Sequence, residues 1–185
     1  MPRRLNAYSL SKDQFTEWGA TCGRNKAIRF VNIRLDHLYG PGDDPSKFPN
    51  FIVHSCLKGV PELRLTAGEQ KRDFVFIADV LSAFETLLDS QIDKKPGFVS
   101  YDVASGRPVR IRRFVETIKR LTGSTTKLHF GAVPYRPHEL MQTRLDIGPM
   151  RRLGWTPRYD LKRGLEITIR HENLLFSEGV HTCDT

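Results

Sequence analysis

The sequence has 185 residues, of which 39% are hydrophobic and 27% are charged, a composition typical of a soluble globular protein rather than a disordered one. No apolar run approaches the roughly 20 residues that a helix needs to cross a bilayer, so we expect no membrane-spanning segment. A formal net charge of +8 favours anionic partners, such as phosphorylated small molecules, nucleic acid or acidic lipids.

The cysteines exclude two further classes of protein. Cys22, Cys56 and Cys183 are far apart and odd in number, and no C-x-x-C or H-E-x-x-H spacing occurs. We therefore expect neither a disulfide framework nor a metal site. The basic first residues, MPRRLNAYSL, are not followed by an apolar stretch, which argues against a signal peptide. A reducing, cytoplasmic location is expected.

The first predicted element is a helix over residues 8–22, and it carries Tyr8 and Lys12 four positions apart. That spacing places both side chains on one face of the helix. The run AIRFVNIRL at 27–35 is rich in branched apolar residues and predicts a mostly buried strand, which ends in the loop YGPGDDP.

Short strands alternate with helices along the rest of the chain, which predicts the α/β class. Ser46, Asp79 and Asp160 are expected to cap the helices that follow them. No repeat or low-complexity linker occurs, so we expect residues 1–185 to form one domain. The predicted strands lie at 62–66, 73–77, 98–103 and 127–130, and the predicted helices at 47–58, from 79 onward, at 111–122, 146–153 and 161–176.

The Tyr8–Lys12 pair suggests proton-transfer chemistry. A free tyrosine has a pKa near 10, and an ammonium group one turn away stabilises the phenolate. Such a tyrosine can exchange a proton with the oxygen of a sugar or an alcohol. The spacing alone also occurs on many exposed helices, so a surface pair without function is the alternative.

A series of motifs follows in order: RLDHLYGPG, KFPNFI, LTAGEQKRDFVFIADV, YDVASG, YRPHE and RRLGWTP. With Tyr8 and Lys12 ahead of it, this series resembles the C-terminal portion of the NAD-dependent epimerase/dehydratase family, the extended short-chain dehydrogenases/reductases that act on nucleotide-sugars. The segments RLDHLYGPGDDPSKF and LTAGEQKRDF look most like those of nucleotide-sugar reductases of the CDP-abequose synthase type, which serve polysaccharide biosynthesis.

The resemblance implies an extended Rossmann-type fold and NAD or NADP as the cofactor. None of the 14 glycines forms a glycine-rich dinucleotide fingerprint after a strand. We therefore expect a partial domain that lacks the N-terminal dinucleotide-binding half: the catalytic helix, the last Rossmann strands and the substrate lobe. The chain alone is expected to be inactive, and its open strand edge to favour a homodimer or a complementing Rossmann chain.

Site residues also follow from the resemblance. It implies that Tyr8 is the acid/base, that Lys12 binds the nicotinamide ribose and tunes Tyr8, and that Leu35 and His37 lie beside the nicotinamide. The implied contacts with a nucleotide-diphosphate sugar come from seven residues: His37, Lys47, Phe48, Leu65, Arg72, Arg136 and Glu139. The two arginines are expected to hold the phosphates, because a guanidinium group can bind them in a bidentate manner.

Departures from the family pattern leave alternatives open. His37 and Asp102 stand where many relatives have asparagine, and His138 replaces the glycine of an R-P-G-D or R-P-G-E motif. Phe48 and Leu65 have a second interpretation as core residues, and Arg72 has one as an ion pair with Asp73.

Three functions therefore compete. The first is catalysis of hydride transfer at a sugar carbon, as part of a larger or split enzyme. The second is a module that binds a nucleotide-sugar without chemistry. The third, a nucleic-acid-binding domain, ranks last because no zinc finger, RNP-type strand or compact basic helix is present.

Overall fold

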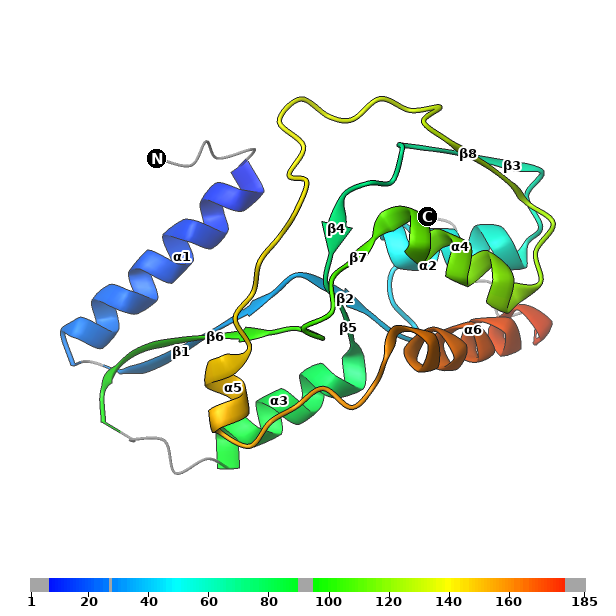
Figure 1. The fold of residues 1–185 in the computed structure, drawn as a ribbon. Helices are drawn as coiled ribbons and strands as arrows, with labels where there is room; N and C mark the ends of the chain where they lie inside the picture. Colours follow the sequence, from blue (N-terminus) through cyan, green and yellow to red (C-terminus); the bar gives the residue numbers. More distant parts are fainter. Residues whose placement is uncertain (1–6, 27, 90–94, 179–185) are drawn as a thin grey trace.

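The structure is a computed structural model that describes residues 7–26, 28–89 and 95–178 (Figure 1). Its strands form four two-stranded sheets, and three of these are parallel, which requires the helical crossovers of an α/β fold. The parallel pairs are β1 (Arg29–Leu35) with β6 (Gly97–Val103), β2 (His37–Tyr39) with β5 (Phe74–Phe76), and β3 (Glu62–Leu65) with β8 (Lys127–Phe130). The antiparallel pair is β4 (Lys71–Arg72) with β7 (Val109–Arg110).

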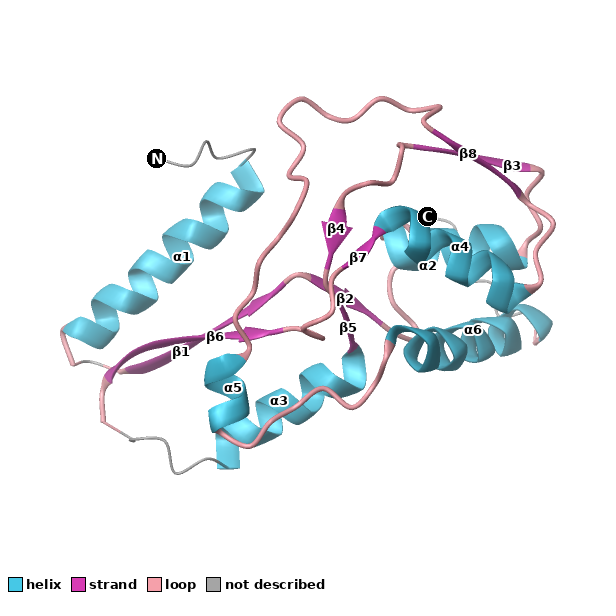
Figure 2. Ribbon diagram, in the orientation of Figure 1, coloured by secondary structure: helices cyan, strands magenta, loops and turns pink. Residues whose placement is uncertain are grey.

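Three helices gather on one side of the molecule and enclose the larger core (Figure 2). These are α2 (Phe48–Leu57), α4 (Ile111–Thr122) and α6 (Leu161–Ser177). The apolar stripe of α4 is fully buried here, with Phe114 and Ile118 each 0% exposed. The rings of Phe74 and Phe114 stack with centroids 3.8 Å apart, which ties β5 to α4.

A second core lies between α3 (Ile77–Asp89), α5 (Gly148–Arg152) and β6. Met150 and Val103 are completely buried in it. The indole N–H of Trp155 donates to the carbonyl oxygen of Asp79 at 3.2 Å and to the hydroxyl of Ser82 at 3.0 Å. Trp155 is therefore a structural anchor.

Helix α1 (Ala7–Arg24) lies on the β1–β6 pair, away from the larger core (Figure 1). The two residues of α1 that are buried are Gly19 and Gly23. A Cβ at Gly19 would enter the ring of Phe30, and one at Gly23 would lie 2.6 Å from the backbone of Gly97. These glycines let the helix approach the strands closely.

The structure confirms the α/β class and each helix that the sequence predicts, with small shifts at the ends. The capping role expected for Asp160 is also confirmed, because its carboxylate accepts the amide hydrogen of Arg163 at 2.8 Å. Residue 27, at the start of the first predicted strand, and Cys183 lie outside the described residues.

Two predicted caps are wrong. Helix α2 begins after Lys47, while the amide of Ser46 donates to the Asp44 carboxylate at 2.8 Å, so Ser46 belongs to the preceding turn. Helix α3 already begins at Ile77, which puts Asp79 inside its first turn. The buried carboxylate of Asp79 accepts from the amides of Arg158 and Tyr159 at 2.8 and 3.1 Å, and so holds the loop before α6.

Candidate functional site

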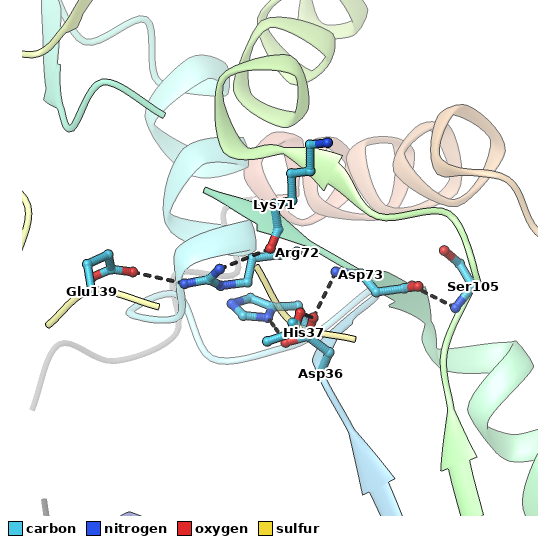
Figure 3. A network of polar contacts seen from close by, with 8 residues as sticks. Asp36, His37, Lys71, Arg72, Asp73, Ser105 and Glu139 are labelled. Atoms are coloured by element: carbon cyan, nitrogen blue, oxygen red, sulfur yellow. Dashed lines mark hydrogen bonds and ion pairs between the residues drawn. The ribbon is translucent and has the colours of Figure 1, made fainter. Parts of the chain in front are cut away.

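A buried carboxylate, Asp36, organises the junction between β1 and β2 (Figure 3). It accepts the amide hydrogen of Asp73 at 2.8 Å, contacts His37 Nδ1 at 2.8 Å, and accepts a hydrogen bond from the hydroxyl of Thr143. Burial opposes ionisation of Asp36, but the hydrogen bonds from His37, Thr143 and Asp73 outweigh it and hold the pKa of this carboxyl below its usual value. Asp36 is therefore an anion that fixes the His37 ring.

Arg72, on β4, lies next to this junction and is almost buried, at 8% exposed. Its guanidinium donates to Glu139 Oε1 at 2.9 Å and to the backbone oxygen of Lys71 at 3.0 Å (Figure 3). Asp73 is engaged elsewhere, since its carboxylate accepts the amide hydrogen of Ser105 at 2.7 Å. Arg72 thus pairs with Glu139 rather than with Asp73.

The segment that carries Glu139 forms a tight turn. The amide of Glu139 donates to the backbone oxygen of Arg136 at 3.0 Å, and His138 has a φ angle of 62°. That left-handed conformation is the one glycine adopts without strain, so His138 keeps the backbone path that a glycine would favour. Arg136 is exposed at the start of this turn, and its side chain is accessible to a ligand.

Tyr8 and Lys12 share one face of α1, as predicted, with the Lys12 ammonium 5.3 Å from the centroid of the Tyr8 ring. Tyr8 is 69% exposed. Lys47 lies within electrostatic reach of Tyr8. A hydrogen bond to Asp43 raises the pKa of Lys47, and the charges of Asp43, Asp44 and Tyr8 act in the same direction.

The remaining predicted residues fall into two groups. Lys47 is 58% exposed, and its ammonium lies 2.6 Å from Asp43 Oδ1; Leu35, at the end of β1, is also partly exposed. Phe48 and Leu65 pack into the larger core, in agreement with their alternative interpretation as core residues. A ligand would reach Leu65 only if that core opened.

The sequence alone assigns no role to Asp36, Thr143 or Ser105. Thr143 lies 107 positions from Asp36, and no local pattern relates the two. Asp102, which stands where many relatives have asparagine, is paired within the fold. Arg34 Nε lies 2.6 Å from the Asp102 carboxylate, and the amide of Asp146 donates to its other oxygen.

None of the helices in the described part of the chain is both long and apolar enough to span a bilayer. No group of three or more His, Cys, Asp or Glu side chains is placed to hold a metal ion in that part of the structure.

Residues 1–103 match the family model described as the NAD dependent epimerase/dehydratase family. The chain belongs to this family. It is 33% identical to the CDP-abequose synthase of Salmonella typhimurium over 89% of its own length, which corresponds to 55% of that protein. The chain thus spans about half the length of the curated relatives that it matches.

Solved structures show the same relationship. The fold matches a Thermus thermophilus UDP-glucose 4-epimerase in complex with NAD, with a TM-score of 0.77 and 25% identity over 89% of this chain and 53% of that one. It also matches the UDP-glucuronic acid 4-epimerase of Bacillus cereus, with a TM-score of 0.83 and 22% identity over 95% and 55% of the two chains. Family members and structural neighbours bind NAD or NADPH.

Proposed function

We propose that this chain supplies the catalytic helix and the substrate-binding residues of an NAD(P)-dependent nucleotide-sugar reductase or epimerase. The observation that carries this proposal is the shared face of Tyr8 and Lys12, with the Lys12 ammonium 5.3 Å from the centroid of the Tyr8 ring. An acid/base group beside phosphate-binding cations suits a substrate that joins a sugar to a diphosphate.

The residues present fit one end of the dinucleotide. Lys12 and Tyr8 are exposed and adjacent, so both can contact the nicotinamide ribose, while Leu35 ends β1 and His37 begins β2. The sequence carries no glycine-rich fingerprint for the pyrophosphate. When bound, the cofactor supplies or accepts the hydride at a sugar carbon.

The chain's own residues move the proton and hold the substrate. Tyr8 exchanges a proton with the sugar oxygen, and the Lys12 ammonium stabilises the phenolate form. Arg72 and Arg136 hold the diphosphate. Of the five N–H donors of a guanidinium, the Arg72 bonds to Glu139 and Lys71 occupy two, which leaves donors for a phosphate oxygen. Glu139 then positions Arg72 as well as accepting from a ribose hydroxyl.

Calorimetry with CDP, UDP and dTDP tests the substrate site. Arg136 is exposed, so Arg136→Gln is expected to leave the fold intact and to weaken binding by about tenfold or more, because a charge-assisted contact contributes on the order of 1.5–3 kcal/mol. Arg170→Gln removes an equally exposed charge on α6 and is the control. Equal affinities of the two variants would contradict the assignment.

An assay for oxidation of NADH or NADPH separates the enzyme from a binding module. The 185 residues lack the dinucleotide fingerprint, so we expect no oxidation with a CDP-4-keto sugar, although the nucleotide binds. Turnover that Tyr8→Phe abolishes would show instead that the chain is catalytic by itself. Self-association, or pairing with a complementing chain, stays a prediction that sedimentation measures.

A further inference from the structure

An open cavity of about 800 Å³ lies beside the polar network of the candidate site, with which it shares Ser105. Its walls come from the segment that joins β6 to β7, the first turns of α4, and the segment that joins α5 to α6 (Figure 1). None of the predicted catalytic, cofactor or substrate residues lines it. Its volume lies within the range of roughly 300–1,000 Å³ that small-molecule pockets occupy.

The lining of this cavity is strongly basic. It contains five arginines and one lysine: Arg107, Arg113, Arg151, Arg158, Arg163 and Lys162. Asp160 is the one acidic residue in the described lining, and its carboxylate already accepts the amide hydrogen of Arg163 at the start of α6. The cavity therefore has a large excess of positive charge.

These arginines differ from others in the chain in what they contact. Arg34, Arg72 and Arg110 each pair with a carboxylate. Over the described residues, no carboxylate lies within ion-pair distance of four of the cavity's arginines, which are Arg107, Arg113, Arg151 and Arg158. Like charges gathered in one concave place repel each other, and a bound anion relieves that repulsion.

The chemistry of the lining indicates which anion fits. Guanidinium groups bind phosphate oxygens in a bidentate manner, and several in one cavity favour more than one phosphate charge. The cavity also contains the ring of Tyr159, with the guanidinium of Arg163 5.0 Å from its centroid. We propose that this cavity is a second binding site for a small, multiply charged phosphate compound, of which inorganic pyrophosphate is the simplest.

Nuclear magnetic resonance locates the binding of pyrophosphate residue by residue. The whole chain, labelled with ¹⁵N, is titrated with inorganic pyrophosphate at constant ionic strength. We expect the largest shifts at the backbone amides of Arg107, Arg158 and Lys162, and we expect the same shifts in Arg136→Gln. Because this variant damages the proposed substrate site, the two proposals can fail independently. Shifts confined to residues 136–139, or none at millimolar pyrophosphate, would overturn the second site.

Calorimetry with matched double variants tests whether the cavity or only net charge matters. Arg107→Gln with Arg158→Gln is expected to weaken pyrophosphate binding by about tenfold or more. Arg120→Gln with Arg170→Gln removes two equally exposed charges outside the cavity and is expected to have a much smaller effect. An equal loss of affinity in both double variants would show that net charge, rather than the cavity, governs pyrophosphate binding, and would contradict the proposal. If a DNA duplex bound more tightly than pyrophosphate and shifted the same backbone amides, a small-molecule site would be ruled out.

Discussion

Helices α1 and α4 meet the rest of the molecule in opposite ways. In α4, Phe114, Val115 and Ile118 are completely buried among α2, α6 and β5. In α1, the buried residues are the two glycines, and Trp18 is 77% exposed. The strand under α1 shows the same difference, since no residue of β1 is classed as buried.

The region around α4 is therefore held together by a buried apolar core, whereas α1 is held by a few close contacts. Burial of apolar area stabilises by roughly 25 cal/mol per Å², so we expect α4 to contribute more to the free energy of unfolding than α1 does. Helix α1 contributes less and opens more easily. The candidate site joins the two regions, with Tyr8 on α1 and Arg72 close to the core. Its geometry therefore depends on how firmly the two regions are held together.

The largest expected effect comes from Phe114→Ala. The ring is completely buried and stacks on Phe74, so its removal leaves a cavity and is expected to lower the free energy of unfolding by about 3–5 kcal/mol. Phe15→Ala is the control on α1: Phe15 is 61% exposed, and its loss is expected to lower the free energy by less than about 1 kcal/mol. Urea titration measures both. Similar losses would mean that α1 is as firmly packed as α4.

A smaller effect is expected at the joint between the two regions, from Asp36→Asn. Asp36 accepts hydrogen bonds from groups at three places in the chain, and a bond to a charged group contributes roughly 1.5–3 kcal/mol. We expect a loss of that size in the free energy of unfolding at neutral pH. Glu85→Gln, which removes an exposed carboxylate on α3, is expected to have little effect.

The pH dependence distinguishes lost charge from lost packing at Asp36. The folded-state pKa of Asp36 is lower than its unfolded value of 3.8. Its stabilisation is therefore fully present above the unfolded value and is lost as the pH falls through the lower, folded value. The wild-type chain should lose this contribution on acidification below pH 3.8, whereas Asp36→Asn should not. Parallel acid titrations of stability would contradict a role for the charge.

Local patterns were sufficient to predict the helices. The apolar stripe of 111–122 gives α4, and Gly123 follows it with a φ angle of 64°, as a glycine after a helix usually does. The caps predicted at Ser46 and Asp79 are wrong for different reasons: the amide of Ser46 bonds to Asp44 in a local turn, whereas the Asp79 carboxylate bonds to the amides of Arg158 and Tyr159. Local propensity is a weak guide where tertiary contacts compete for the same polar group.

The candidate site shows the same limit. Arg72 and Glu139 were both predicted as ligand contacts, but their ion pair links residues 67 positions apart and follows no sequence spacing. The sequence also did not predict strand β2. Its three residues form a strand only because they pair with β5. Features that depend on residues close in sequence could be predicted. Features that depend on contacts between residues far apart in sequence could not.

The smallest expected effect concerns the turn that carries Arg136 and Glu139. His138 adopts a φ angle of 62°, which costs a residue with a side chain roughly 1–2 kcal/mol relative to glycine. Glycine also raises the conformational entropy of the unfolded chain, and this offsets about 0.5–1 kcal/mol of the gain in the free energy of unfolding. His138→Gly is therefore expected to raise the free energy of unfolding by about 0.5 kcal/mol. His138→Ala keeps the backbone strain and should give no gain, so an equal gain with alanine would show that the imidazole, rather than the backbone conformation, destabilises this turn.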